Sequence, residues 1–183
     1  MSVVQKNVLV SIDEYLEAEK HSQVKHEYVR GQVYAMVGSS RTHNKLTLAL
    51  ASSLRGHLQG GACEVLASDV KVRIGDVFYY PDVQVTCSKT DTDPYFSTQP
   101  LLIIEVLSAS TEAADRLDKR LSYQSLASLE EYVLVSQERP QVQVYRKVGA
   151  TWDLETYAEA DTVRFVSIGF SIPMTEIYRD VTR

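Results

Sequence analysis

Residues Leu101–Leu107 form a nearly continuous apolar run that only Glu105 interrupts. A short run of this composition is typical of a β-strand that is covered on both faces. Such a strand lies inside a sheet, and helices cover both sides of that sheet. This one segment therefore predicts a layered protein built from helices and strands together.

Two helices are expected before this strand. The first, Ile12–Lys20, begins with a capping box in which Ser11 and Glu14 satisfy free backbone N–H groups. The second, Arg41–Gln59, has a leucine at every fourth position over three turns and ends at a pair of glycines. The leucine spacing places one apolar stripe along the helix, and we expect that stripe to face the sheet.

A third helix is expected after the central strand. Ser110 or Thr111 can cap its start, and the helical pattern reaches about Ala127. Leu117 and Leu121 are four residues apart, so they share a face that we expect to point inward.

The other strands are short and irregularly spaced along the chain. Their order predicts the α/β (α+β) class, with one central mixed β-sheet flanked by helices, in a single domain over residues 1–183. We expect residues Ser88–Gln99, which are polar, to form a loop, and Met174–Tyr178 a short helical turn. The expected strands are Lys25–Val29, Gln32–Val37, Cys63–Ala67, Val70–Ile74, Tyr79–Thr86, Glu131–Val135, Gln141–Arg146, Trp152–Tyr157 and Val163–Val166.

Cysteine content and hydropathy indicate the compartment. Cys63 and Cys87 stand alone and belong to no metal-binding or redox motif, so we expect both to be reduced. The N-terminal residues lack a secretory signal pattern, and no apolar stretch approaches the ~20 residues of a membrane-spanning helix. These features predict a soluble, cytoplasmic protein with no membrane partner.

Glu105 is the most informative residue of the chain, because a carboxylate inside a buried strand is costly unless it is paired or bound to a cation. Its alternative role is a structural ion pair. Asp82 follows Pro81, which marks a strand entrance or edge. A Pro-Asp pair is also a common turn element, so the aspartate alone does not identify a site.

Together, the two acids predict a cation site. Asp82 and Glu105 lie on neighbouring expected strands separated by one loop, so both can project from the same sheet into one cleft. Carboxylates brought that close repel each other unless a cation neutralises them. Oxygen ligands without sulfur or paired histidines suit Mg²⁺ or Mn²⁺. Lys119 and Tyr123, four residues apart on the third helix, share a face that can reach the acids.

The net charge of −5 bears on the choice of partner. An acidic protein does not attract nucleic acid through its overall field. Binding of a phosphate backbone therefore has to depend on a local group of cationic side chains or on a metal ion.

Several short segments, in this order, resemble the Uma-two family of restriction endonucleases, part of the PD-(D/E)XK nuclease superfamily. The resemblance covers about residues 12–145 and implies a restriction-endonuclease-like core, to which residues 146–183 add C-terminal strands. The segments are Lys25–Tyr28 with Gly31, His43 with Asn44, Tyr80–Val83, Glu105–Ser108, Ser110–Glu112, and Asp115 with Lys119 and Tyr123.

The resemblance also implies the residues of an active site. Asp82 and Glu105 match the two acids that bind the divalent ion, and Glu27 matches an acid that completes the metal site in many superfamily members. The usual lysine lies two residues beyond the second acid, where this chain has Leu107. Lys119 is the residue that matches the lysine from the next helix.

The activity implied by the resemblance is Mg²⁺-dependent hydrolysis of DNA phosphodiester bonds. Ser108 and Tyr123 are expected to support the metal ligands, and His43 to contact phosphate or substrate. A homodimer is expected by analogy, because trailing strands in such folds often meet a symmetric partner and two active sites suit two DNA strands.

Two other functions stay open from the sequence. Leu107 and the acidic net charge also fit a catalytically inactive nuclease-fold protein that serves as a DNA-binding or protein-interaction module. Two acids in a cleft can instead hydrolyse glycosides, in which case Tyr79, Tyr80 and Tyr95 could supply aromatic platforms for sugar.

Overall fold

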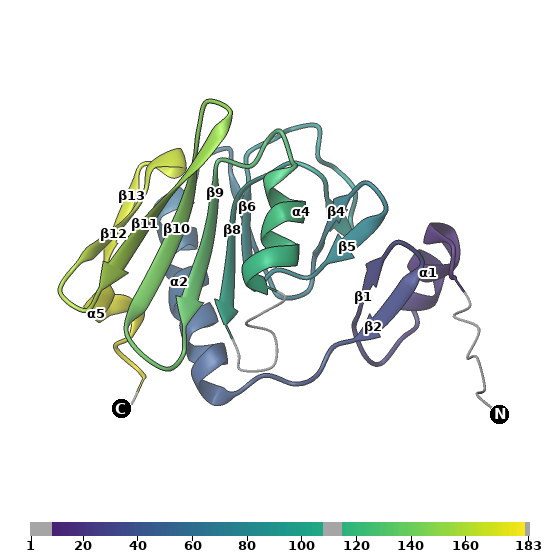
Figure 1. Cartoon of the computed structure of the whole chain (residues 1–183), viewed down its shortest axis with the longest axis horizontal. Coiled ribbons are helices and arrows are strands. Elements are labelled where there is room, and N and C mark those ends of the chain that lie inside the picture. Colours follow the sequence, from purple (N-terminus) through teal and green to yellow (C-terminus); the bar gives the residue numbers. More distant parts are fainter. Residues whose placement is uncertain (1–8, 108–114, 182–183) are drawn as a thin grey trace.

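Figure 1 shows the computed structural model, which describes residues 9–107 and 115–181. The helical elements are α1 (Ile12–Glu19), α2 (Arg41–Leu58), the π-helical turn η1 (Asp115–Lys119), α4 (Arg120–Gln124), the 3-10 turn η2 (Val166–Ile168) and α5 (Met174–Ile177). The strands are β1 (His26–Val29), β2 (Gln32–Ala35), β3 (Glu64–Ala67), β4 (Lys71–Ile74), β5 (Val77–Tyr79), β6 (Val83–Thr86), β7 (Phe96–Ser97), β8 (Pro100–Leu107), β9 (Glu131–Ser136), β10 (Gln141–Val148), β11 (Thr151–Ala158), β12 (Thr162–Phe165) and β13 (Phe170–Pro173).

The strands of the described residues form two main sheets and a small hairpin. The six-stranded sheet has the order β11-β10-β9-β8-β6-β3, and the five-stranded sheet has the order β2-β1-β5-β4-β7. Strand β8 runs antiparallel to β6 and parallel to β9, so the larger sheet is mixed. In Figure 1, α4 lies in front of this sheet and α2 behind it. The expected α+β architecture, a mixed sheet flanked by helices, is confirmed.

Strand β8 is covered on both faces, as the apolar run predicts. Leu102 and Ile104 share a core cluster with the leucines of α2. Ile103 and Leu107, on the opposite face, belong to a second cluster with Tyr123 of α4. Because side chains alternate along a strand, Glu105 points to the same face as Ile103. The carboxylate therefore enters the layer between β8 and α4.

The N-terminal helices follow the local signals in the sequence. Ser11 and Glu14 form the predicted capping box of α1, with hydrogen bonds in both directions. In α2, three of the predicted leucines, Leu46, Leu50 and Leu54, are almost completely buried against the six-stranded sheet. Burying such a side chain contributes roughly 1.5–3 kcal/mol, so this stripe docks the helix onto β6 and β8.

The third helix differs from its prediction. Leu117 and Leu121 are 53% and 55% exposed, whereas Lys119 and Tyr123 are buried. The π-helical turn η1 precedes a helix that ends at Gln124, and this wider turn changes which residues face the sheet. The inward face of the element is therefore polar at its start, which matters for the site described below. The expected caps, Ser110 and Thr111, lie outside the described residues.

The segment expected as one strand, Tyr79–Thr86, contains the last residue of one strand and the whole of a second strand, which belong to different sheets. Strand β5 ends at Tyr79 in the five-stranded sheet, and β6 begins at Val83 in the six-stranded sheet. Pro81 between them has no N–H group to donate to a ladder, so pairing stops there. The residues around Pro81 therefore connect the two sheets, and Asp82 lies directly before β6.

The polar segment Ser88–Gln99 is more ordered than the loop expected from its sequence. Phe96 and Ser97 form the short strand β7, which pairs parallel with β4. The Asp91 carboxylate accepts hydrogen bonds from the side chains of Ser97 and Thr98 and from two backbone N–H groups. Burial raises the pKa of Asp91, but these bonds together outweigh burial and leave the pKa below its usual value. They also fold the segment back on itself.

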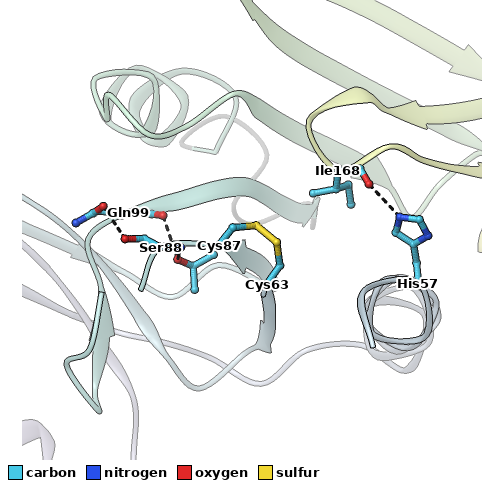
Figure 2. The surroundings of a disulfide bond; sticks show 7 residues. His57, Cys63, Cys87, Ser88, Gln99 and Ile168 are labelled. Atoms are coloured by element: carbon cyan, nitrogen blue, oxygen red, sulfur yellow. Dashed lines mark hydrogen bonds between the residues drawn. A yellow bond between two sulfur atoms is a disulfide. The ribbon is translucent and has the colours of Figure 1, made fainter. Parts of the chain in front are cut away.

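The expectation of reduced cysteines is wrong, because Cys63 and Cys87 form a disulfide with an S–S distance of 2.04 Å (Figure 2). Strands β3 and β6 are antiparallel with Glu64 opposite Thr86, so the next positions outward are these two cysteines. Their Cα atoms are 4.0 Å apart although 24 positions separate them in the sequence. The spacing of the two cysteines in the sequence does not indicate this disulfide, because the bond depends on the register of β3 against β6.

The remaining predicted strands agree with the structure to within two residues at each end. Strand β13 was not predicted; it pairs with β12 and contributes Ile172 to the core around α2. Among the described residues, no helix combines the length and apolar character needed to cross a bilayer. The cytoplasmic location stays a prediction.

Candidate active site

The two acids singled out by the sequence occupy opposite positions on neighbouring strands. Val83 of β6 pairs with Ile104 of β8 in an antiparallel register. Continuing that register by one step places Asp82 opposite Glu105. Directly opposed residues of an antiparallel pair project to the same face of the sheet. Asp82 itself precedes β6, and its carboxylate contacts His43 of α2, whereas the Glu105 carboxylate contacts Lys119 and Tyr123 on the side of α4. The expected convergence of both carboxylates in one cleft therefore stays a prediction.

Glu105 is held by two groups on the helix that covers it. The side chain is almost completely buried, at 4% exposure for the residue. The hydroxyl of Tyr123 donates to Glu105 Oε1 at 3.2 Å, and Lys119 Nζ lies 3.7 Å from the same oxygen. The buried carboxylate thus has the cation and the hydrogen bond that its position requires.

Lys119 also contacts the third acid predicted for the site. Its Nζ atom lies 2.8 Å from Glu27 Oε1 on β1, and the lysine is 9% exposed. The same Glu27 oxygen accepts the backbone N–H of Tyr80 at 3.3 Å. One ammonium group therefore lies between two carboxylates, one from each sheet. The prediction that Lys119 reaches the acids agrees with this contact.

Asp82 is oriented by two contacts of its Oδ2 atom. The backbone N–H of Val106 donates to this oxygen at 2.7 Å, and His43 Nε2 lies 3.1 Å from it. His43 belongs to the first turn of α2, which Ser40 caps by accepting the His43 N–H. His43 thus contacts the aspartate, and its expected contact with phosphate or substrate stays a prediction. Ser108 lies outside the described residues.

Burial sets the protonation of the Tyr123 phenol. It raises the pKa of Tyr123 well above its usual range, and the nearby charges of Glu105 and Glu27 raise it further. Tyr123 therefore stays protonated and keeps donating to the Glu105 carboxylate. The centre of the Tyr123 ring also lies 5.5 Å from the centre of the Tyr79 ring. Tyr123 therefore packs in the core through its ring and binds Glu105 through its hydroxyl.

The residue types fit a hard dication, because Asp82 and Glu105 offer carboxylate oxygens from neighbouring positions of the backbone. Mg²⁺ characteristically takes one or two protein carboxylates and completes its shell with water and phosphate oxygens. Within residues 9–107 and 115–181, no group of three or more His, Cys, Asp or Glu side chains is arranged to hold a metal ion. The role of Glu27 as a third ligand stays a prediction, since Glu27 is paired with Lys119.

Several residues around the site had no signal in the sequence. The hydroxyl of Tyr80 donates to Glu19 Oε1 at 2.9 Å, and Glu19 also accepts the backbone N–H of His26. These bonds tie α1 and β1 to the segment that carries Asp82. A cavity of about 390 Å³ opens beside Asp82, and Thr47 and Val37 are among its lining residues. Both features arise from segments that are distant in the sequence.

Comparison with known proteins identifies the family. The family model Uma2, described as "Putative restriction endonuclease", matches residues 12–175. The chain belongs to this family. The match starts where the resemblance in the sequence starts and extends past the core limit of about residue 145 into the C-terminal strands.

Relatives of this Uma2 chain are similar over most of their length. The uncharacterized protein slr1290 of Synechocystis sp. (strain ATCC 27184 / PCC 6803 / Kazusa) is 40% identical over 174 residues, covering 93% of this chain and 92% of the relative. The uncharacterized protein sll1609 of the same organism is 33% identical over 154 residues, covering 81% and 87%.

A solved structure shares the fold of this Uma2 chain. It is described as "a putative nuclease belonging to DUF820 from Anabaena variabilis ATCC 29413" and superposes with a TM-score of 0.79. The superposition covers 93% of this chain and 98% of the other, at 15% sequence identity. The likeness therefore concerns the fold alone.

Proposed function

We propose that this protein is a nuclease that hydrolyses DNA phosphodiester bonds with the help of Mg²⁺ or Mn²⁺. The observation that carries the proposal is the placement of Asp82 opposite Glu105, with the ammonium of Lys119 beside the buried acid. Membership of a family described as "Putative restriction endonuclease" supports the same activity. The DUF820 structure with the same fold is described as "a putative nuclease".

Each side chain of the site has a distinct task in this proposal. A divalent ion held by Asp82 and Glu105 would supply a bound water of lowered pKa and charge stabilisation at a phosphate oxygen. His43 and the Val106 N–H fix the direction of the Asp82 carboxylate. The Tyr123 hydroxyl holds Glu105 against the sheet. These contacts keep the ligands in place before substrate arrives, and such preorganisation lowers the barrier to reaction.

Lys119 is proposed to perform the task that a strand lysine performs elsewhere in the superfamily. Position 107, where the motif would place that lysine, holds a leucine that packs in the core. Lys119 brings a positive charge to the same acids from η1 instead. Its ammonium can orient the attacking water or stabilise charge that develops on the phosphate.

Plasmid nicking tests the proposal. Wild-type protein is expected to convert supercoiled plasmid to nicked and linear forms with Mg²⁺ or Mn²⁺ and to stop in EDTA. Asp82→Asn is expected to lose this activity, while Asp153→Asn, at an exposed position on β11, keeps it as a matched control. Equal nicking by Asp82→Asn and wild type would reject the proposal. DNA binding without cleavage by wild type would favour the inactive module instead.

The expected homodimer is part of the proposal. A dimer would place two sites on one duplex, which suits cleavage of both strands. Sedimentation equilibrium is expected to give twice the chain mass of 20.6 kDa. A single species at the chain mass at micromolar concentration would reject the dimer without bearing on cleavage.

A further inference from the structure

Gln137 lies directly after β9 and connects two elements of the candidate site. Its Nε2 atom donates to the carbonyl oxygen of Leu107 at 2.7 Å, and its Oε1 atom accepts the hydroxyl of Ser40 at 2.5 Å. Leu107 is the last residue of β8, and Ser40 is the N-cap residue of α2. In Figure 1, the start of α2 lies at the edge of the sheet where β8 and β9 end. One side chain therefore bridges the end of the central strand and the start of the helix that carries His43.

The hydrogen-bonding groups of this bridge allow one arrangement of donors. A backbone carbonyl only accepts, so the Gln137 amide turns its NH₂ group to Leu107 and its oxygen to Ser40. The Ser40 hydroxyl oxygen accepts the backbone N–H of His43 at 3.0 Å, and the hydroxyl proton is therefore available to the Gln137 oxygen. A flipped amide would place two acceptor oxygens together at Leu107. The bridge therefore has a fixed direction.

The bridge closes a ring of contacts that passes through Asp82. His43 Nε2 lies 3.1 Å from Asp82 Oδ2, and the same oxygen accepts the backbone N–H of Val106 at 2.7 Å. Val106 and Leu107 are consecutive residues of β8, so the ring returns to the strand from which it started. Hydrogen bonds linked in this way polarise and orient one another. The direction of the Asp82 carboxylate is therefore coupled to the position of the Gln137 side chain.

The start of α2 has few contacts of its own that would fix its position. Residues 36–40, which precede the helix, form neither helix nor strand, and residues 37–40 are exposed. The buried leucines of α2 begin at Leu46, in its second turn, so the turn that carries His43 precedes the packed part of the helix. Segments with few buried contacts open locally more readily than the core does. A link from Ser40 to the end of β8 opposes such opening.

We propose that Gln137 is a positioning residue of the candidate active site. It holds Ser40, and with it the first turn of α2, at the distance from β8 at which His43 meets Asp82. This inference rests on the proposed nuclease function, because it depends on the assignment of Asp82 to the metal ion. Metal affinity is then expected to depend on Gln137 through His43.

Mn²⁺ affinity, measured by electron paramagnetic resonance in a double-mutant cycle, tests this proposal. Gln137→Met keeps the length of the side chain but removes both hydrogen bonds, and it is expected to weaken Mn²⁺ binding about fivefold. Gln59→Met makes the same change at the exposed C-cap position of α2 and is expected to bind like wild type. In the His43→Ala background, Gln137→Met is expected to have no further effect, because the residue through which it acts is gone. Additive losses in the double variant, or equal affinity of Gln137→Met and wild type, would overturn the proposal.

Variants of Ser40 break the same bridge from the other side, and they decide the question if Gln137→Met does not fold. Ser40→Gly removes the hydroxyl at little cost to the helix, because glycine is an accepted N-cap residue. It is expected to reproduce the fivefold loss of Mn²⁺ affinity, within about a factor of two. Ser40→Thr keeps a hydroxyl and is expected to recover most of the affinity that Ser40→Gly loses. Wild-type affinity in Ser40→Gly would contradict the proposal.

The proton on the His43 imidazole gives a measurement that needs no metal. In EDTA, the Nε2 proton that faces Asp82 is expected to exchange slowly with water in wild type and faster in Gln137→Met, as followed by NMR. Equal exchange in the two proteins would count against the positioning role.

Failure of this proposal and failure of the nuclease proposal give different results. Faster exchange in Gln137→Met, with no Mn²⁺ binding or nicking by wild type, would reject the nuclease and keep the positioning role. Metal-dependent nicking by wild type, with equal Mn²⁺ affinity and equal proton exchange in Gln137→Met, would reject the positioning role and keep the nuclease.

Discussion

Lys119 Nζ lies 2.8 Å from Glu27 Oε1 and joins the turn after the central strand to a strand of the N-terminal hairpin. The same ammonium lies 3.7 Å from Glu105 Oε1. One lysine therefore connects the two sheets through ion pairs with Glu27 of one sheet and Glu105 of the other. The charge that a strand lysine would bring arrives here from the π-helical turn.

Replacing Lys119 tests this relationship. Lys119→Met is expected to lower the plasmid-nicking rate by about 10²–10³-fold, because in the proposed mechanism this ammonium orients the water or stabilises charge on the phosphate. Lys119→Arg, which keeps the charge, is expected to recover part of the rate. Lys89→Met, on the exposed segment after β6, serves as the control. Circular dichroism checks that each variant folds, and full activity of a folded Lys119→Met would exclude a catalytic role.

His43 is predicted to act through Asp82. Without it, the Asp82 carboxylate loses one of its two orienting contacts, and such supporting partners typically change metal affinity by about 10–100-fold. His43→Ala is therefore expected to weaken Mn²⁺ binding by about tenfold, measured by electron paramagnetic resonance. His43→Gln keeps a side-chain donor and is expected to recover much of the affinity. Identical Mn²⁺ affinity in wild type and His43→Ala would contradict this positioning role.

The disulfide is predicted to stabilise the edge of the six-stranded sheet. Cys63→Ser with Cys87→Ser opens a loop that spans 24 positions, so the free energy of unfolding is expected to fall by about 3 kcal/mol. Urea unfolding followed by fluorescence measures this change. Wild type in dithiothreitol should match the double variant. Two titratable thiols in unfolded, never-reduced protein would show that the bond does not form.

Alkaline pH is predicted to weaken the anchorage of the C-terminal segment. Burial raises the pKa of Tyr178 to about 12, and its hydroxyl donates to the backbone oxygens of Ser136 and Gln141. The unfolded chain loses this proton near pH ~10, whereas the folded chain keeps it, so unfolding is favoured as the pH rises. Stability is thus fully present below about pH 10 and falls by up to about 1.4 kcal/mol per pH unit up to about pH 12.

Tyr178→Phe isolates this contribution. The variant is expected to be about 1 kcal/mol less stable at pH 7, because it loses the hydrogen bonds, but its stability should decline less steeply above pH ~10. Tyr95→Phe changes an exposed tyrosine and should reproduce the wild-type slope. The slopes come from chemical unfolding at intervals between neutral pH and about pH 12. Parallel curves for wild type and Tyr178→Phe would contradict the prediction.

Local patterns in the sequence were sufficient for the main elements and for the two central acids. The apolar run of β8 and the leucines of α2 are each encoded within a few turns or residues, so periodicity predicts them. Asp82 and Glu105 could be placed on neighbouring strands from the sequence because a single polar segment separates the apolar stretches of β6 and β8, and consecutive apolar strands usually pair. A buried charge such as Glu105 is visible as soon as its strand is recognised.

Tertiary structure alone decided which distant residues meet at the site and at the sheet edge. The contact of Lys119 with Glu27 depends on how the two sheets are joined at Pro81 and on the extra width of the η1 turn. The Cys63–Cys87 bond depends on the register of β3 against β6. Contacts of this kind follow from the packing of whole layers, whose energy is summed over many residues. A pattern within one segment therefore does not predict contacts between distant segments.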